Sequence, residues 1–516
     1  MMRVPERILP WLLVAQFAQA VSAAFAETAA QPAGPAYRPD APVLFEATDC
    51  WGTLGSRSPT YCGWFTVPAD WDGPGDATVT LPVVVYRPRI AEPGLAPVIY
   101  LAGGPGYPAL GPGGGDVASW RRAADRLFPG RSLIIFDQRG SGLGTPQLAC
   151  PEGNDPQIWW DLSTDPRRFE GIRERLWPAY RSCRDRLLAE GIDLRTFNSR
   201  QIAADVEALR RVLGHERVVV FGISYGTRLA LTVMRHYPES IAAAVLDSVQ
   251  PPQAVMSNLD GAGYGAALDR LFAACAGHLD CAAAYPDLPR DLERLLTRLA
   301  KAPAIIEVDN LKSFKPLYAR VDHHLFLGIL RREMQHTASL SRLPGLIAGM
   351  AKGEDWRLKP HAENIIYGSF PRDYDMGMHL SIVCHDDGER RGGDGSGEQG
   401  SLSGYIAWVR RLDLCSIWPS GQAHPSEAEP VVSTVPSLLL AGALDASTTI
   451  EFAQAAAETL AVSHLFIFAA TAHGQLQSSD CAREVVRAFL ASPRERPARP
   501  CLATQRRPAF LALGLR

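Results

Sequence analysis

Residues 216–238 read Glu-Arg-Val-Val-Val-Phe-Gly-Ile-Ser-Tyr-Gly-Thr-Arg-Leu-Ala-Leu-Thr-Val-Met-Arg-His-Tyr-Pro, and this stretch decides the fold. The apolar run 218–221 is typical of a buried strand, and the apolar residues after Gly226 recur at helical spacing. The turn between them has glycines two positions before and two positions after Ser224. We expect a side chain at either glycine to collide with neighbouring backbone. The stretch therefore predicts a strand, a strained turn that holds Ser224 above the sheet edge, and a helix.

The backbone N–H of Tyr225 lies at the start of the predicted helix. Unpaired amides and the helix dipole favour negative charge there, so this amide is a candidate for half of an oxyanion hole. A Gly-x-Ser-x-Gly match alone is expected by chance about 0.2 times in such a glycine-rich chain. A plain glycine-rich turn is therefore the alternative. The strand before it and the helix after it favour the functional interpretation.

The bulk composition is that of a large globular protein. The chain has 516 residues, of which 47% are hydrophobic, and a formal net charge of −3. This length suggests one large domain with an insertion, or two or three smaller domains. Lys and Arg are scattered along the chain, so we expect neither nucleic acid nor an anionic membrane as a partner.

The first 26 residues have the pattern of a signal peptide. Arg3 and Arg7 precede an apolar stretch over residues 8–25, which ends in the small-x-small motif Ala24-Phe25-Ala26. A membrane anchor is the alternative, but Pro10 and several polar residues make a weak spanning helix. We predict cleavage after residue 26, no stable membrane insertion of the mature chain, and export. The cleavage motif and the Arg- and Ala-rich composition favour a Gram-negative periplasm over full secretion.

The chain has ten cysteines, and this even number fits an oxidising compartment. No Cys-x-x-Cys pair is present, so metal binding is the weaker alternative and we predict no metal site. The sequence does not determine the connectivity, yet pairing each cysteine with the next one closes five short loops without crossing. The predicted pairs are Cys50 with Cys62, Cys150 with Cys183, Cys275 with Cys281, Cys384 with Cys415, and Cys481 with Cys501.

Apolar, β-branched runs predict strands along the whole chain. The predicted strands are 78–86, 97–101, 132–136, 218–221, 243–246, 437–440 and 464–468. Helical patterns such as the one over 202–213 lie between several of them. This alternation predicts an α/β fold with a mostly parallel sheet and helices on both faces. Functional residues should then gather at the C-terminal ends of the strands.

Two more glycine-rich turns follow strands in that position. In Ala102-Gly103-Gly104-Pro105-Gly106, the glycines let backbone approach a ligand, and the N–H of Gly104 is a candidate second oxyanion donor. In the second turn, Asp137 can cap local amides and Arg139 can pair with it or with another carboxylate. We expect a structural role for this second turn.

The motifs Gly103-Gly104-Pro105-Gly106, Asp137-Gln138-Arg139-Gly140 and Gly222-Ile223-Ser224-Tyr225-Gly226, in that order, resemble those of a known family. They are similar to the α/β-hydrolase-fold proline iminopeptidases and, more closely, to the secreted tripeptidyl aminopeptidase-like hydrolases. The resemblance covers most of the mature chain. It implies an α/β-hydrolase fold and serine-dependent hydrolysis. Ala102 stands where proline iminopeptidases usually have His, but the oxyanion donor is a backbone amide, so the hole is retained.

The other two triad members are expected later in the chain, in the order Ser, Asp, His. Asp445 lies just after the predicted strand 437–440, and His473 lies just after the strand 464–468. The family places its acid and its base at these matching positions. Residues 446–449 replace a proline-containing turn that relatives often carry, so this loop can differ in shape. The triad predicts an acyl-enzyme mechanism that needs no metal and no organic cofactor.

The long segment between Ser224 and Asp445 exceeds what the sheet units require. We predict a mainly helical cap over residues 251–429, which divides the hydrolase core into 27–250 and 430–516. Residues Gly392–Gly404 are expected to form a mobile polar loop. An aminopeptidase cap must offer an acid to the substrate's ammonium group, and Asp386 is the candidate because relatives carry acids in the matching segment. A solvated acid beside a disulfide is the alternative.

Three functions remain open at this point. The first is a secreted serine exopeptidase that releases N-terminal residues or short peptides. The second is a carboxylesterase or lipase-type hydrolase of small esters, because the same residues serve both reactions. The third is a non-catalytic binding protein, which is disfavoured because all three triad residues are present. The substrate is accordingly a peptide or a small ester, and the sequence does not determine the proline preference or the oligomeric state.

Overall fold

The computed structural model describes most of the chain after residue 40. The described ranges are 41–51, 60–111, 117–154, 168–256, 261–309, 317–362, 374–391, 401–411, 414–498, 500–503, 508 and 510–511. The predicted signal peptide lies outside them, as do residues 392–400 of the predicted loop over Gly392–Gly404. Leu402 to Gly404 begin helix α14 (Leu402–Arg411), so that part of the loop prediction is wrong. The helix forms because Tyr405 and Ile406 pack in a hydrophobic cluster of neighbouring helices.

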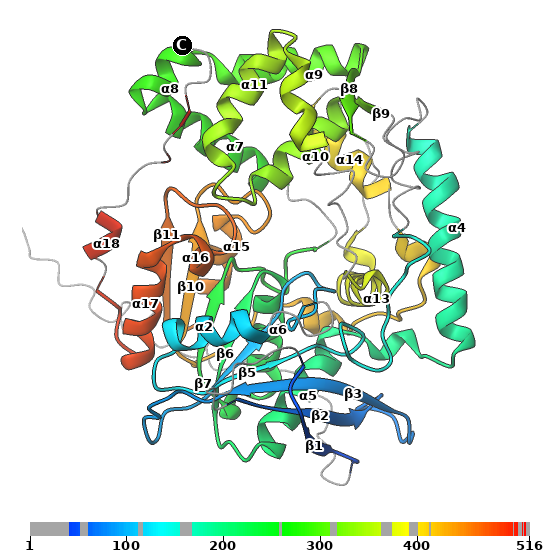
Figure 1. Ribbon diagram of the computed structural model, residues 1–516, viewed down its shortest axis with the longest axis vertical. Coiled ribbons are helices and arrows are strands. Elements are labelled where there is room, and N and C mark those ends of the chain that lie inside the picture. The colour runs from blue at the N-terminus through cyan, green and yellow to red at the C-terminus, as the bar shows by residue number, and fades with distance from the viewer. Residues whose placement is uncertain are drawn as a thin grey trace, which may run out of the picture.

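A nine-stranded sheet forms the centre of the described structure (Figure 1). Its order is β1-β2-β3-β5-β4-β6-β7-β10-β11. The strands are β1 (Leu44–Thr48), β2 (Thr60–Pro68), β3 (Thr78–Tyr86), β4 (Val98–Leu101), β5 (Leu133–Phe136), β6 (Val218–Ile223), β7 (Ile241–Asp247), β10 (Ser437–Gly442) and β11 (Ser463–Phe468). From β5 to β11 neighbouring strands are parallel, whereas β1, β2 and β3 pair antiparallel at one edge. The predicted, mostly parallel sheet is confirmed.

Helices cover both faces of this sheet, because each presents an apolar face to the buried strands. One face is covered by α5 (Ser199–Val212), α6 (Tyr225–His236) and α15 (Ile450–Ala457), and buried residues of α4 (Arg168–Ala189) join the same hydrophobic cluster. The other face is covered by α2 (Val117–Leu127) and α17 (Asp480–Ala491), with the short helices α16 (Gln475–Ser478) and α18 (Pro500–Ala503) beside them.

A second group of elements, here called the cap, lies above the C-terminal ends of the parallel strands (Figure 1). It comprises α7 (Gly261–Ala276), α8 (Leu279–Ala284), α9 (Leu288–Lys301), the hairpin of β8 (Ala304–Val308) and β9 (Leu317–Val321), α10 (His323–Glu333), α11 (Leu343–Ala351) and α14. The cap has its own hydrophobic cluster, which extends to Leu444, Ala446 and Ala472. The cap therefore packs on the loops that follow β10 and β11.

Helix α13 (Met376–Asp387) lies in the same stretch of sequence but packs differently. Its buried side chains Met378, Leu380 and Ile382 join the cluster of the sheet and of α5 and α6. A buried ion pair of 3.1 Å also links Asp387 to Arg228 of α6. A cap that spans all of residues 251–429 therefore remains an interpretation, since this helix belongs with the core by its packing.

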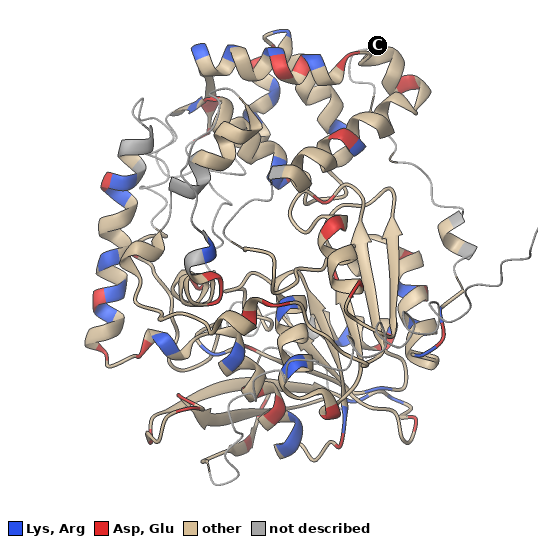
Figure 2. Cartoon of the chain, turned by 180° about the vertical axis from the view of Figure 1, so that it is seen from behind, with Lys and Arg blue, Asp and Glu red and all other residues tan. Residues whose placement is uncertain are grey.

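Five disulfides hold the described structure together. They are Cys50–Cys62, Cys150–Cys183, Cys275–Cys281, Cys384–Cys415 and Cys481–Cys501, so the predicted pairing is confirmed. Acidic and basic residues are scattered over the helices, strands and loops (Figure 2). No helix in the described ranges is long and apolar enough to cross a membrane.

Candidate active site

The turn that carries Ser224 has the strained geometry that the sequence predicts. Ser224 lies between β6 and α6 with φ 59° and ψ −126°, in a region that residues other than glycine rarely adopt. A Cβ atom at Gly222 would lie 2.2 Å from the carbonyl oxygen of Gly226. One at Gly226 would lie 2.0 Å from the carbonyl oxygen of Leu101. The predicted collision is thus confirmed, and only glycine fits at both positions.

Asp445 and His473 meet between the loops that follow β10 and β11. His473 Nδ1 and Asp445 Oδ2 are 2.7 Å apart, and Asp445 is fully buried. The hydroxyl of Thr448 lies 2.6 Å from the same carboxylate oxygen and 3.1 Å from His473 Nδ1. The backbone N–H of Ser447 donates to the other carboxylate oxygen at 2.8 Å. The carboxylate is therefore held in place to accept the Nδ1–H of the imidazole, which leaves Nε2 free to take a proton.

Each partner of this pair stabilises the charge of the other. Burial raises the pKa of Asp445, but the charge of His473 and the hydrogen bonds from His473, Thr448 and Ser447 bring it below its ordinary value. Burial lowers the pKa of His473, but the charge of Asp445 and its hydrogen bond raise it above its ordinary value of 6.5. Asp445 is therefore ionised at neutral pH, and it favours a protonated imidazole beside it.

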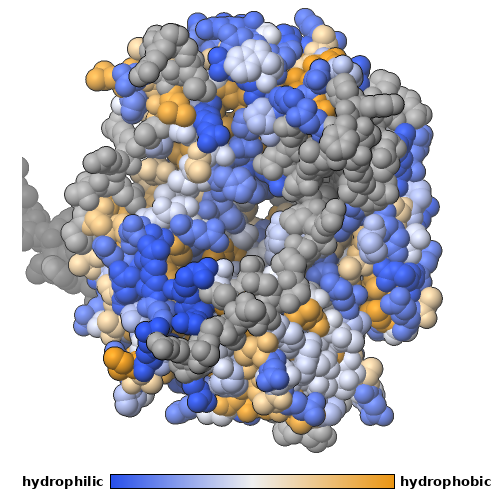
Figure 3. Space-filling model, viewed as in Figure 1, coloured by the Kyte–Doolittle hydropathy of each residue, from blue (hydrophilic) through white to orange (hydrophobic). Residues whose placement is uncertain are grey.

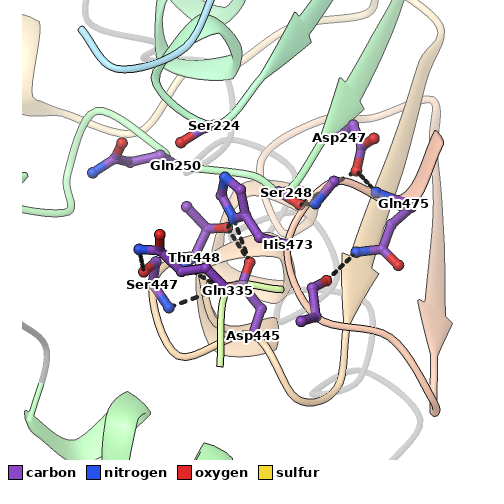
Figure 4. Close-up of polar contacts among 12 residues, drawn as sticks. Ser224, Asp247, Ser248, Gln250, Gln335, Asp445, Ser447, Thr448, His473 and Gln475 are labelled. Carbon is purple, nitrogen blue, oxygen red and sulfur yellow. Dashed lines mark hydrogen bonds and ion pairs between the residues drawn. The ribbon is translucent and has the colours of Figure 1, made fainter. Parts of the chain in front are cut away.

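The loop that carries His473 is tied to the neighbouring strand β7. The N–H of Gly474 donates to Ser248 Oγ at 2.8 Å, and the N–H of Gln475 donates to Asp247 at 2.8 Å. Figure 4 shows the imidazole of His473 between the Asp445 carboxylate and Ser224. Ser224 Oγ and His473 form no hydrogen bond in the structure. Such bonds are often long before substrate binds and shorten in the complex.

The two predicted oxyanion donors belong to the turn after β4, which carries Gly104, and to Tyr225, the residue that follows Ser224. A Cβ atom at Gly103 would be 3.2 Å from the Cβ atom of Ser224, so the glycine turn after β4 packs directly on the serine. Gly104 has a φ of 114°, which favours glycine. The N–H groups of Gly104 and Tyr225 donate no hydrogen bond to any other described residue. Both remain available to an oxygen bound beside Ser224, as the sequence predicts for an oxyanion hole.

Helix α13 supports the glycine turn after β4. The N–H of Asp375 donates to the carbonyl of Gly106 at 2.9 Å. His379 Nδ1 lies 3.1 Å from the carbonyl oxygen of Pro105 and 2.6 Å from the hydroxyl of Tyr374. Burial lowers the pKa of His379 to about 4, so this imidazole is neutral at physiological pH. The turn is therefore fixed by contacts from a neighbouring helix and not by its own sequence alone.

The turn after β5 has the structural role that the sequence predicts. Asp137 accepts hydrogen bonds from the N–H groups of Leu110 at 2.9 Å and Leu143 at 3.1 Å. Burial raises the pKa of Asp137 to about 6. Arg139 pairs with Asp205 at 2.6 Å, and both side chains are fully buried. The turn thus fastens the loops at the strand ends to α5.

Asp386, the predicted ligand for a substrate ammonium group, has protein partners. Its carboxylate accepts a hydrogen bond from the hydroxyl of Ser199 and lies 3.1 Å from His385 Nδ1. Ser199 Oγ in turn lies 2.8 Å from the hydroxyl of Tyr225. Asp386 does not line the cavity at Ser224, because α13 directs this acid toward the start of α5. Through Ser199, Asp386 therefore helps to hold the side chain of Tyr225 in place. The structure offers no support for amine binding by Asp386.

A cavity of about 240 Å³ lies beside Ser224, between the core and the cap. The space-filling view shows the molecule hollowed between these two parts (Figure 3). Residues from the core and from α10 line it, among them Gly104, Gln250, Arg331, Gln335 and Thr448. None of the described lining residues is acidic. A ligand there meets Ser224, Gly104 and the positive charge of Arg331.

One group of side chains in the described ranges has the spacing of metal ligands. It consists of Cys150, Glu152 and Cys183. Both sulfur atoms are bonded to each other in a disulfide, so they are not available to a metal. The absence of a cofactor and of a metal stays a prediction from the proposed chemistry.

Sequence reasoning missed three residues at this site. Thr448 stands three positions after Asp445, a spacing common in hydrogen-bonded turns, and this pattern was available in the sequence. Gln335 accepts the N–H of His473 at 3.3 Å with its carbonyl oxygen and bonds Ser447 with its side chain. Arg331 lines the cavity from the same end of α10. No local pattern marks these last two, because only the packing of the cap brings them to the site.

Two protein families match parts of the chain. The family described as the alpha/beta hydrolase fold matches residues 96–279, and the family described as TAP-like protein matches residues 405–501. The first segment contains Gly104 and Ser224, and the second contains Asp445 and His473. The resemblance that the motifs indicate is thereby confirmed.

Several curated proteins are distant relatives. A putative hydrolase, YuaR, from Escherichia coli is 25% identical over 45% of this chain and 46% of its own length. The serine protease Hip1 of Mycobacterium tuberculosis is 24% identical over 43% of this chain and 42% of its own length. Tripeptidyl aminopeptidase of Streptomyces lividans is 28% identical over 40% of this chain and 38% of its own length. The chain thus spans less than half the length of each of these relatives. With its strand order, its serine turn and both matched segments, the chain is an α/β hydrolase that carries a TAP-like region.

Proposed function

We propose that the protein is an exported serine exopeptidase that releases N-terminal residues or short peptides. One observation carries the proposal: the hydrogen-bonded pair of Asp445 and His473 lies beside a serine in a strained turn, at a cavity. Ser224, Asp445 and His473 form the catalytic triad, and the amides of Gly104 and Tyr225 form the oxyanion hole. The names of two relatives, a tripeptidyl aminopeptidase and a serine protease, favour peptides as substrates.

The first half of the reaction forms an acyl-enzyme. Ser224 Oγ attacks the scissile carbonyl carbon while His473 Nε2 takes its proton. Asp445 accepts the Nδ1–H bond and stabilises the imidazolium that results. The carbonyl oxygen becomes an oxyanion that accepts hydrogen bonds from the N–H groups of Gly104 and Tyr225. His473 then gives its proton to the leaving amine as the C–N bond breaks.

The second half releases the acyl group. A water molecule enters where the amine left and attacks the ester carbonyl, and His473 Nε2 takes a proton from it. The second tetrahedral intermediate collapses with transfer of that proton back to Ser224 Oγ. The products are the free acid and the regenerated serine. Apart from this water molecule, every catalytic group is a side chain or an amide of this chain.

The disulfides support a location outside the cytoplasm. Five disulfides of this kind form and persist in oxidising compartments. Together with the predicted signal peptide over residues 1–26, they support export to the periplasm or beyond.

Hydrolysis of small carboxylic esters is the second candidate function. The observation that favours it is the lack of an acidic side chain among the described residues that line the cavity. An exopeptidase that recognises a free ammonium group needs such an acid or another set of acceptors. The catalytic steps are the same for an ester and for an amide, so recognition alone separates the two functions.

A substrate comparison tests the proposal against this alternative. Chromogenic aminoacyl and tripeptidyl amides, each with a free and with an acetylated N-terminus, are assayed beside short acyl esters, with Ser224→Ala as control. We expect turnover of the free amides, loss of that turnover on acetylation, and no turnover by the variant. Ester turnover with no dependence on a free amine would instead establish the esterase function.

The pH dependence follows from the pKa of His473. Asp445 raises the pKa of His473 above 6.5, and only the neutral imidazole can take the proton of Ser224. We therefore expect kcat/KM to rise with pH, with the midpoint of its acid limb above pH 6.5. Rates measured from pH 4 to pH 9 with one substrate check this. A midpoint below pH 6.5 contradicts the assignment of His473 as the base in this environment.

A further inference from the structure

Arg331 is a cation at the cavity, and no ion pair joins it to a described residue. It lies in α10 and lines the same cavity as Ser224. Its Nε atom is buried and has no hydrogen-bond acceptor. No carboxylate in the described ranges forms an ion pair with its guanidinium. The side chain as a whole is partly exposed, and an unpaired guanidinium beside a cavity is well placed to receive an anionic ligand.

Other arginines of the cap contrast with Arg331. Five of them pair with a carboxylate nearby: Arg270 with Glu451, Arg290 with Asp287, Arg294 with Asp291, Arg298 with Asp355, and Arg357 with Glu354. Most described arginines in this part of the chain are thus paired with a carboxylate, whereas Arg331 is not.

The described wall of the cavity leaves the charge of Arg331 uncompensated. None of its described residues is acidic, and Gln250 and Gln335 are neutral. His379 is neutral as well, because burial lowers its pKa to about 4. The charge of Arg331 is close enough to the catalytic pair to lower the pKa of His473. The lining of the cavity therefore favours an anionic group close to Arg331.

We propose that Arg331 binds a carboxylate of the substrate and makes the enzyme prefer acyl compounds with a negative charge near the scissile carbonyl. This inference rests on the proposed function, since it names the substrate class of the same site. A guanidinium pairs with a carboxylate through two parallel hydrogen bonds, which fixes position as well as charge. The cavity of about 240 Å³ is at the small end for ligand sites, so the carboxylate and the scissile bond lie close together.

Two kinds of substrate carry such a carboxylate. An acidic side chain can lie on the acyl side, as in the p-nitroanilide of glutamate, for which the p-nitroanilide of glutamine is the neutral match. A free C-terminal carboxylate can lie on the leaving side, as in trialanine, for which trialanine amide is the neutral match. Measuring kcat/KM for both pairs distinguishes the two sources.

We expect at least one of these two pairs to show a preference for the carboxylate of roughly 10- to 100-fold in the wild-type protein. Arg331→Gln should reduce that ratio toward one, and Arg331→Glu should invert it. Any effect of Arg331 on the basicity of His473 acts on both members of a pair and cancels in the ratio. Arg290→Gln is the matched control, since it removes a cap charge that is 76% exposed and does not line the cavity.

Two results would overturn this inference: kcat/KM ratios near one for both pairs in the wild-type protein, or a preference for the carboxylate that survives Arg331→Gln. In either case, turnover of the amides would still support the proposed function. No turnover of any amide would instead argue against the exopeptidase. Binding is then measured without turnover, by the rate at which a fluorophosphonate modifies the protein. Glutarate should slow that reaction more than glutaramide does, and Arg331→Gln should abolish the difference. Equal effects of the two compounds contradict a carboxylate site.

Discussion

Replacing Ser224 with alanine should lower kcat by about 10⁵- to 10⁶-fold, the size of the effect when a Ser-His-Asp hydrolase loses its nucleophile. Without Oγ no acyl-enzyme forms, and only binding and the oxyanion hole still assist attack by water. Because the triad acts as a unit, Ser224→Ala combined with His473→Ala should be no slower than either change alone. Steady-state kinetics on the best amide substrate measure both effects.

Folding must be separated from catalysis in this comparison. Alanine keeps the Cβ atom of Ser224, so the turn with φ 59° is strained to the same extent in the variant. We expect an unchanged circular dichroism spectrum and melting temperature. Ser492→Ala, at an exposed position after α17, serves as the matched control and should keep full activity. Residual turnover of more than about one per cent in Ser224→Ala would contradict its role as nucleophile.

Replacing Asp445 with asparagine should lower kcat by about 10⁴-fold. The amide group of asparagine can donate a hydrogen bond to Nδ1 of His473, which places the imidazole proton on Nε2. A protonated Nε2 cannot accept the proton of Ser224. Asparagine has the shape of aspartate and keeps an oxygen for the N–H groups of Ser447 and Thr448. The loop should therefore stay folded.

The measurement for Asp445→Asn is kcat over a range of pH, together with thermal unfolding. A loss of less than about tenfold in a folded variant would mean that Asp445 does not set the tautomer of His473. If the variant does not fold, Asp445→Glu provides a second test, because it keeps the charge but shifts the carboxylate and should retain part of the activity.

Much of the sheet could be predicted from local patterns. Strands such as β6 and β10 are buried over their whole length and therefore appear as continuous apolar runs in the sequence. The edge strand β1 and its neighbour β2 were missed. β1 is mostly exposed, and β2 contains a cysteine, a glycine and a terminal proline, so neither has the apolar run of a buried strand. β1 pairs with β2 and β2 pairs with β3, and the local sequence does not show either pairing.

The residues of the site could likewise be predicted where local sequence positions them, and not where distant contacts do. Ser224, Asp445 and His473 each follow a strand directly, so the fold alone directs them to one sheet edge. The positions of the cap residues depend instead on how the helices of the cap pack against one another and against the core. Asp386 was expected at the cavity but faces α5, whereas Arg331 reaches the cavity with no sequence motif to mark it. Helix orientation across such a long insertion follows from its tertiary contacts.

The central claim is that Ser224 is the nucleophile that forms the acyl-enzyme. Reaction of the mature protein with a fluorophosphonate tests it most directly, because an activated serine oxygen displaces fluoride from phosphorus and keeps the label. Intact mass and peptide mapping by mass spectrometry then locate the adduct. The account predicts one adduct per chain on Ser224 of the wild-type protein, slow labelling of His473→Ala, and none of Ser224→Ala. An adduct on another serine with Ser224 unmodified, or undiminished labelling of Ser224→Ala, would contradict it.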